Sequence, residues 1–150
     1  MKTVEEYTKL AYDNFKSGYN CCQSVVLAFS DLLNLDRETL ARLASGFGAG
    51  MGKMREVCGA VSGMFMVASM LKGYISPTAT VEKADTYAMI MKLGEGFKSE
   101  FGTIICKELL NLDCDGNPVP SERTPEYYKK RPCADMCAVS AKLLAEYLSK

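Results

Sequence analysis

Cysteine carries the most distinctive chemistry in this sequence, because seven cysteines occur among 150 residues and histidine is absent. In a cytosolic chain of this size, cysteine enrichment indicates redox or metal chemistry more than a framework of structural disulfides. The odd number leaves at least one thiol unpaired within the chain. Without histidine there is no imidazole base for a serine or cysteine hydrolase. A metal would have to bind thiolates, carboxylates, methionine or backbone groups.

Four thiols are predicted to lie at or near helix starts, namely Cys21, Cys58, Cys106 and Cys133. Asn20 is a suitable N-cap before the first of them, Thr103 precedes the third, and Pro132 fits the start of the last helix. The free N–H groups and dipole of a helix N-terminus stabilise a thiolate, which predicts thiol pKa values below about 8.5. Lys53 and Arg55 would strengthen this effect at Cys58. We therefore expect four activated thiols.

The other three cysteines are predicted to matter less. An adjacent disulfide between Cys21 and Cys22 would be strained. Cys137 lies one turn after Cys133 on the same helix face, so these two thiols are a conceivable redox pair. Cys114 falls in a loop, where we expect no role. The sequence contains no CxxC pair, so neither a thioredoxin-like motif nor a zinc ribbon is supported.

Glycines are dense on both sides of Cys58. The alternating glycines at 46, 48, 50 and 52 could hold an anion with their N–H groups. A dinucleotide-binding fingerprint, however, requires a preceding strand and a βαβ unit, and neither is predicted. We interpret this stretch as the lead-in that places Cys58 at a helix start. Gly59 and Gly63 leave one helix face bare, so another helix backbone, or a flat haem-like cofactor, could approach it closely.

Two other hypotheses use the same residues. In one, Cys21, Cys58, Cys106 and Cys133 bind a metal or an iron–sulfur centre. Five methionines would be soft partners for copper(I) or iron, namely Met51, Met54, Met64, Met66 and Met70. Methionine also fills helical cores, and we favour that interpretation of these side chains. In the other hypothesis the cysteines are small buried hydrophobes of a structural or interaction domain.

The elements that must position these thiols are all predicted to be helices. Apolar spacing and capping residues indicate helices over 4–16, 21–33, 37–45, 56–72, 80–101, 104–110 and 133–149. The range 56–72 is apolar on nearly all sides, which predicts a buried central helix. The fifth helix, capped by Thr78 or Thr80, has Ala84, Tyr87, Ala88 and Met91 on one face. Residues 111–131 should form an ordered loop with a helical turn near 125–129, and this loop is a candidate wall or lid.

Length and charge define the class of protein. We expect one domain, residues 1–150, with an all-α compact fold of about six or seven helices. Eighteen basic residues balance eighteen acidic ones, and no basic patch indicates a nucleic-acid partner. The longest apolar run, 61–71, is too short to cross a bilayer, and the N-terminal residues lack a signal core. These features predict a cytoplasmic protein without membrane insertion, and a homodimer fits such a domain.

The motifs around the four cysteines resemble those of a known family. They are Asn20-Cys21-Cys22-Gln23-Ser24-Val25, Cys58-Gly59-Ala60-Val61-Ser62-Gly63, Ile105-Cys106-Lys107-Glu108-Leu109-Leu110 and a late Cys133. This combination resembles the C-GCAxxG-C-C family of small proteins named for redox activity, over nearly the whole chain. The resemblance implies that Cys21, Cys58, Cys106 and Cys133 are the defining cysteines, that the CGAxxG segment is the central motif, and that Cys137 is an extra. It implies redox activity without a defined reaction.

We therefore predict a thiol redox protein with thiol–disulfide oxidoreductase activity. Cys21, Cys58, Cys106 and Cys133 should converge at one site, where two of them cycle between dithiol and disulfide. This hypothesis needs no cofactor and leaves the redox partner and substrate unknown. The alternative is a binding module with a cysteine-ligated iron–sulfur or other soft-metal centre, or a haem-like cofactor against Gly59 and Gly63.

Overall fold

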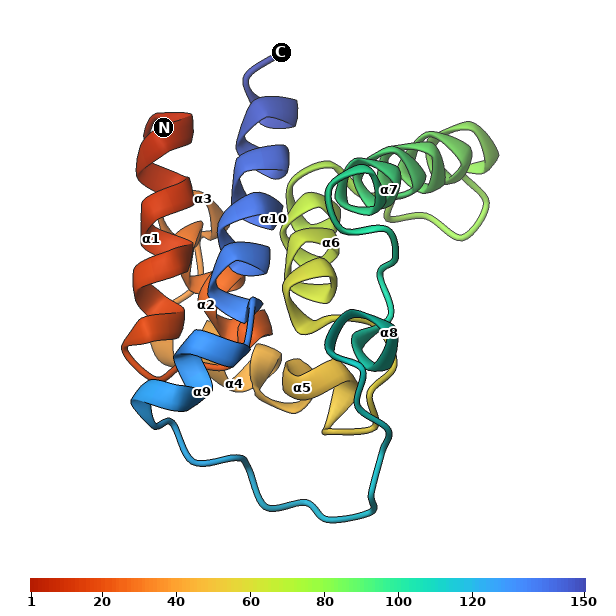
Figure 1. Ribbon diagram of the computed structural model, residues 1–150. Helices are drawn as coiled ribbons and strands as arrows, with labels where there is room; N and C mark the ends of the chain where they lie inside the picture. The colour runs from red at the N-terminus through yellow and green to blue at the C-terminus, as the bar shows by residue number, and fades with distance from the viewer.

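A computed structural model describes all 150 residues as helices joined by turns and loops (Figure 1). The helical segments are α1 (Val4–Lys16), α2 (Cys21–Ala28), α3 (Ser30–Leu33), α4 (Arg37–Ala44), the 3₁₀ turn η1 (Ser45–Phe47), α5 (Gly48–Met51), α6 (Gly59–Lys72), α7 (Thr80–Phe101), α8 (Cys106–Leu110), α9 (Pro125–Lys130) and α10 (Cys133–Leu148). The only strand-like pairing is an isolated antiparallel bridge between Val57 and Ile105. The predicted all-α class is confirmed. Several helices of four to six residues add to the six or seven that the sequence predicts.

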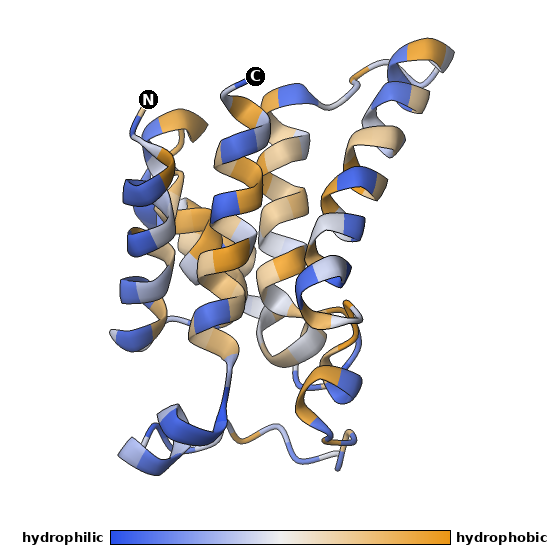
Figure 2. Ribbon diagram, turned by 45° about the horizontal axis from the view of Figure 1, so that its top comes forward, coloured by the Kyte–Doolittle hydropathy of each residue, from blue (hydrophilic) through white to orange (hydrophobic).

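The core lies among α1, α2, α6 and α10, where α10 packs along α1 and α2 packs along α6 (Figure 1). A cluster of 28 buried apolar residues joins these helices. Tyr7 and Phe29 are fully buried within it and stack with their ring centroids 4.3 Å apart. Figure 2 shows the same segregation, with hydrophilic residues along the outer side of α1 and hydrophobic ones towards its neighbours. Each large buried side chain contributes about 1.5–3 kcal/mol, so this region is the main source of stability.

The first two helices begin where the sequence predicts. The Glu6 N–H donates to the Thr3 hydroxyl over 3.1 Å, and the Thr3 N–H donates to the Glu6 carboxylate over 2.7 Å. The start of α2 repeats this arrangement with Asn20 and Gln23, at 2.8 Å and 3.2 Å. Both are capping boxes, in which two orphan N–H groups are satisfied reciprocally.

The helix expected over 21–33 is broken in the structure. Phe29 has φ −102° and ψ 17°, so α2 ends at Ala28 and the short α3 follows. The fully buried Phe29 ring stacks on Tyr7, and this tertiary contact holds the residue outside the helical region. The break is a tertiary effect, because no glycine or proline marks it in the sequence.

The central helix α6 is mostly buried along its first ten residues, whereas its last turn is largely exposed. It begins at Gly59 rather than near residue 56, because the preceding segment is drawn into the Val57–Ile105 bridge. The prediction of a buried central helix is therefore confirmed for the part that follows Cys58.

Helix α7 projects from the bundle (Figure 1) and buries a different face from the one marked by small and apolar residues in the sequence. Its buried residues are Thr86, Met89, Leu93, Gly94 and Phe97. The face with Ala84, Tyr87, Ala88 and Met91 is exposed. No threonine side chain caps the helix, since Ala79 occupies the N-cap position. None of the helices combines the length and the apolar character needed to span a membrane.

Candidate functional site

A cavity of about 400 Å³ lies where the starts of α2, α6, α8 and α10 meet. Its lining includes Cys21, Cys58, Cys106 and Cys133. The structure thus brings to one place four thiols that come from four separate segments of the chain. We call this space the cysteine cavity. All seven cysteines are free thiols, and Cys114 is exposed in the loop after α8.

Three of the four cavity thiols occupy the first residue of a helix, namely Cys21 in α2, Cys106 in α8 and Cys133 in α10. Cys58 is the exception, because it is the N-cap of α6 with extended backbone angles. Its N–H donates to the Ile104 carbonyl over 2.8 Å instead of entering the helix. The prediction that Cys58 lies within the first turn is therefore wrong by one residue.

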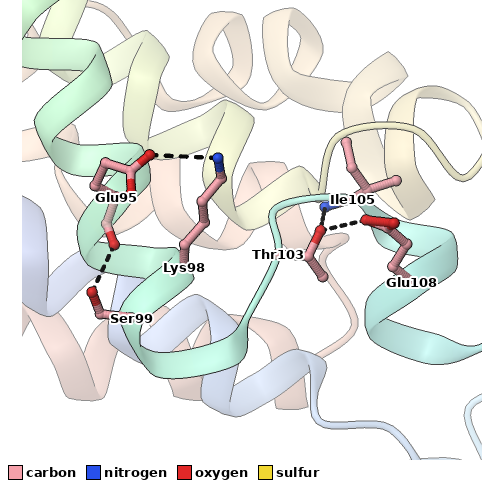
Figure 3. Close-up of polar contacts among 6 residues, drawn as sticks. All are labelled: Glu95, Lys98, Ser99, Thr103, Ile105 and Glu108. Atoms are coloured by element: carbon pink, nitrogen blue, oxygen red, sulfur yellow. Dashed lines mark hydrogen bonds and ion pairs between the residues drawn. The ribbon is translucent and has the colours of Figure 1, made fainter.

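The bridge before α6 fixes Cys58 beside Cys106. The Cys106 N–H donates to the Glu56 carbonyl over 2.6 Å, and the Lys107 N–H donates to the Arg55 carbonyl over 3.1 Å. Thr103 prepares the start of α8 from the other side, since its hydroxyl accepts the Ile105 N–H over 3.1 Å and donates to Glu108 (Figure 3). Two short segments without regular sheet structure thereby align two of the thiols.

The glycine-rich stretch before this bridge has an unusual backbone. Residues 49–53 all have positive φ, between 55° and 70°, and Arg55 follows at 62°. The segment labelled α5 is therefore largely a left-handed turn, closed by the Gly52 N–H on the Gly48 carbonyl over 3.0 Å. Left-handed geometry costs a non-glycine residue about 1–2 kcal/mol, so the turn stores strain beside the cavity.

Glycines allow the close approaches that shape this cavity. A Cβ atom on Gly50 would lie 2.6 Å from the Cys106 Cβ and 2.8 Å from the Arg55 Cα. On Gly59 it would lie 3.0 Å from the Cys21 Cβ, and on Gly63 it would lie 2.9 Å from the Cys22 carbonyl oxygen. Gly59 lines the cavity, whereas α2 fills the space beside Gly63. The space beside Gly63 is therefore occupied by a helix and leaves no room for a flat cofactor.

Burial dominates the chemistry of Cys58 and Cys22. The N–H groups of Val61 and Ala60 favour the Cys58 thiolate, but burial outweighs them and raises the pKa of this thiol to about 12. Burial likewise raises the pKa of Cys22 to about 12. The predicted lowering of the pKa at helix starts is therefore wrong for Cys58, and it is also wrong for the other three cavity thiols, Cys21, Cys106 and Cys133, whose pKa values are raised as well. A helix N-terminus does pull in the expected direction, but it does not compensate for the loss of water around the sulfur.

Cys21 is at the centre of a group of three interacting thiols. The neighbouring Cys133 thiol favours the Cys21 thiolate, but the Cys137 thiol and burial prevail and raise the pKa of Cys21 well above its usual value. The Cys21 thiol, together with burial, raises the pKa of Cys133. Burial raises the pKa of Cys137, whose thiol also donates to the Cys21 carbonyl over 3.7 Å. These three thiols hold their protons at neutral pH.

Cys106 is the cavity thiol in direct contact with a guanidinium group. Burial raises its pKa, while the Arg55 guanidinium, with Nη1 3.7 Å from the sulfur, opposes that rise. The Arg131 charge acts in the same direction. Arg55 therefore contacts Cys106, whereas the sequence suggested that it would act on Cys58. Lys53 contacts neither thiol, because its ammonium donates to the carbonyls of Asn117 and Val119.

The loop between α8 and α9 forms one wall of the cavity, as predicted for residues 111–131. Pro118, Pro120 and Ser121 belong to the lining. Lys53 holds the loop at one point, and Arg123 holds it at another through hydrogen bonds to the carbonyls of Phe15 (2.9 Å) and Tyr19 (3.1 Å). The predicted helical turn is α9, which carries Tyr127 into the lining.

Two groups of residues were missed or undervalued in the sequence. Cys137 belongs to the interacting thiols although it does not line the cavity, and its spacing of four from Cys133 was the available signal. Arg123 and Arg131 reach the cavity from a loop whose course no local pattern reveals. No group of three or more cysteine, aspartate or glutamate side chains is arranged to bind a metal ion, so the metal hypothesis gains no ligand set.

Comparison with known proteins gives one match. A family model with the description "Putative redox-active protein (C_GCAxxG_C_C)" matches residues 19–147. No curated protein and no solved structure matches the chain. The match begins just before Cys21 and extends past Cys133, so it spans all four thiols of the cysteine cavity and most of the helices that position them. This chain therefore belongs to the C_GCAxxG_C_C family.

Proposed function

We propose that this protein is a thiol–disulfide redox protein in which Cys21 and Cys133 pass between dithiol and disulfide. The observation that supports this proposal is that both thiols line the cysteine cavity and that each is the strongest single influence on the pKa of the other. The two residues start different helices, α2 and α10, and both helices pack in the core. The packed helices therefore keep both residues at the lining of the same cavity.

The reaction balances with a small disulfide as oxidant. Cys21 attacks one sulfur of the substrate, and the cysteine proton goes to the departing substrate thiolate. Cys133 then attacks the Cys21 sulfur of the mixed disulfide, and its proton goes to the second departing thiolate. The protein loses two electrons and two protons, and the substrate becomes two thiols. Cys21 is the better first nucleophile, because it is more exposed than Cys133, and because the interaction between the two thiols favours the thiolate of Cys21 and opposes that of Cys133.

Anaerobic thiol counting with peptide mapping tests this proposal. After equilibration of the reduced protein with glutathione disulfide, we expect the native protein to lose two thiols and to contain a Cys21–Cys133 disulfide. Cys133→Ser should stop at the mixed disulfide on Cys21. Cys114→Ser removes the exposed loop thiol outside the cavity and should leave the pair unchanged. Seven thiols that stay free in the wild-type protein, under conditions that oxidise free dithiols, would sink the proposal.

A further inference from the structure

The charges that line the cysteine cavity are all of one sign. Lys53, Arg55, Arg123 and Arg131 reach its lining, and no aspartate or glutamate does. None of the four forms an ion pair within the protein. The charges of Lys53 and Arg55 do reach Asp115, whose pKa is lowered first by the Asn117 N–H and then by these cations, but this carboxylate is exposed on the loop.

The four cations divide into two pairs. Lys53 and Arg123 donate to loop and helix carbonyls, so they hold the cavity wall. Arg55 has a single hydrogen-bond acceptor in the protein, the Cys106 sulfur at 3.7 Å. Arg131 has none for its side chain and stacks on Tyr127, with its guanidinium carbon 4.9 Å from the ring centroid. Arg55 and Arg131 therefore have N–H donors that are free to bind a ligand.

Arg55 is the unusual member, because it is only 6% exposed. A guanidinium group carries five donors and is permanently charged. Burying it is unfavourable unless a binding partner supplies a counter-charge. One contact to a neutral thiol does not satisfy such a group. Its backbone is also held at φ 62°, between the left-handed turn and the bridge to Cys106, so the side chain is fixed in place by a strained segment.

We propose that Arg55 and Arg131 bind the oxyanion group of a small molecule, a carboxylate, phosphate or sulfonate, inside the cysteine cavity. A volume of about 400 Å³ suits a small ligand, and guanidinium groups bind such oxyanions with two parallel hydrogen bonds. If the proposed function holds, the inference also names the substrate class, a disulfide that carries an anionic group, and only this part rests on the proposed function. Binding of the anion itself requires no redox step.

The first experiment measures binding to the reduced wild-type protein. Sulfate, phosphate and malonate are added at constant ionic strength, with chloride as the balancing ion, and the backbone amide NMR signals are followed. We expect saturating shifts at Gly50, Gly59 and Cys106, and none at Phe29 in the core. Stronger binding of sulfate and phosphate would assign a tetrahedral oxyanion, and stronger binding of malonate would assign a carboxylate. Shifts that never saturate for any of the three would overturn the inference.

The second experiment removes the guanidinium groups. Arg55→Met keeps an aliphatic stem and should weaken oxyanion binding about tenfold or more, since charge-assisted hydrogen bonds are lost. Arg42→Met removes the same charge from the exposed surface of α4 and should leave binding unchanged. If Arg55→Met does not fold, Arg131→Met replaces it, because this side chain is only half-buried. A folded variant of either arginine that binds as tightly as the wild type would overturn the assignment of that residue.

The third experiment separates the inference from the proposed function. The wild-type thiols are oxidised by the dianionic 5,5′-dithiobis(2-nitrobenzoate) and by the neutral 4,4′-dithiodipyridine, each relative to free cysteine. We expect the relative preference for the anionic reagent to fall about tenfold in Arg55→Met. Disulfide formation without that preference, and without oxyanion binding, overturns the inference and leaves the proposed function standing. Saturable oxyanion binding without an internal disulfide supports the inference and overturns the proposed function.

Discussion

The two ends of the helical bundle are built on different principles. Around Tyr7 and Phe29 the packed side chains are mainly apolar and fully buried, and the stacked rings lie at the break between α2 and α3. Around the cysteine cavity the backbone is left-handed over residues 49–53, and thiols and a guanidinium group are buried in place of aliphatic side chains. The first end stabilises the fold, and the second carries strain and unpaired polar groups. Such a concentration of strain is typical of functional sites.

This division of the bundle shows how one small chain can hold several buried thiols in place. Helices α2, α6 and α10 each extend from the core to the cavity, so their buried portions position the thiols at their starts. Because the core already holds these helices, the strained turn does not have to contribute to the stability of the fold. Each of the following changes acts on one end of the bundle and should leave the other end largely unaffected.

The largest effect is expected from Phe29→Ala at the core end. Loss of the buried ring and its stacking on Tyr7 should lower the free energy of unfolding by about 3–5 kcal/mol. Denaturant unfolding of the reduced protein measures this loss. The sulfate-induced NMR shifts at the cavity should persist in the folded fraction. If the variant lost less than about 1 kcal/mol, the two-ended description would be wrong at the core end.

Gly50→Ala should act at the cavity end. The new Cβ would lie 2.6 Å from the Cys106 Cβ, and alanine at φ 70° is strained, so we expect a loss of about 2–4 kcal/mol. Gly46→Ala is the matched control, because nothing lies within 4 Å of its Cβ position. It should change stability by less than about 0.5 kcal/mol. Equal effects of the two substitutions in denaturant unfolding would contradict the tight packing of the turn on α8.

Stability should depend on pH in the alkaline range because of the buried thiols. The folded pKa of Cys58 and of Cys22 is about 12, above the unfolded value of about 8.5. Both thiols therefore make their full contribution to the free energy of unfolding below about pH 8.5. That contribution declines as the pH rises towards 12, because unfolding then releases protons. Each thiol should add a slope of about 1.4 kcal/mol per pH unit. Unfolding titrations between pH 8 and 11 should show a shallower slope for Cys58→Ala and an unchanged slope for Cys114→Ala.

The smallest effect is expected from Ala49→Gly in the left-handed turn. Ala49 has φ 55° and ψ 39°, so glycine should relieve strain and raise the free energy of unfolding by about 1 kcal/mol. A gain at this position would be unusual, since glycine lowers stability in most helical segments. Thermal unfolding compares the variant with Ala60→Gly, a right-handed position in α6 where glycine should destabilise. A loss in both variants would show that the turn at Ala49 is not strained.

Local sequence signals predicted the helices well where side chains cap their own helix. Thr3, Asn20 and Asp36 all cap the helices that follow them, and Asp36 does so by accepting the Thr39 N–H over 3.2 Å. The break at Phe29 was not predictable, because it depends on a contact with Tyr7 from another helix. The buried face of α7 was not predictable for the same reason. A helix pattern shows which side chains share a face, whereas the neighbouring helices decide which face is buried.

The four thiols of the cavity were identifiable because each follows a helix-start signal, but their acidity was not. Acidity depends on the water left around the sulfur, and this is set by α2, α6 and α10 together. The basic lining was unpredictable for a similar reason. Lys53 and Arg55 were noticed near Cys58 in sequence, yet the left-handed turn and the bridge direct Arg55 to Cys106 and Lys53 to the loop.

The attachment of the loop by Arg123 extends the cavity to a helix that does not line it. The Arg123 guanidinium lies 4.1 Å from the Phe15 ring centroid and donates to the carbonyls of Phe15 and Tyr19, at and beyond the C-terminal end of α1. The last turn of α1 is thus an attachment point for the loop that forms the cavity wall. Fraying of that turn would open the cavity to solvent without displacing any of its thiols, so access of a ligand is coupled to the order of the first helix.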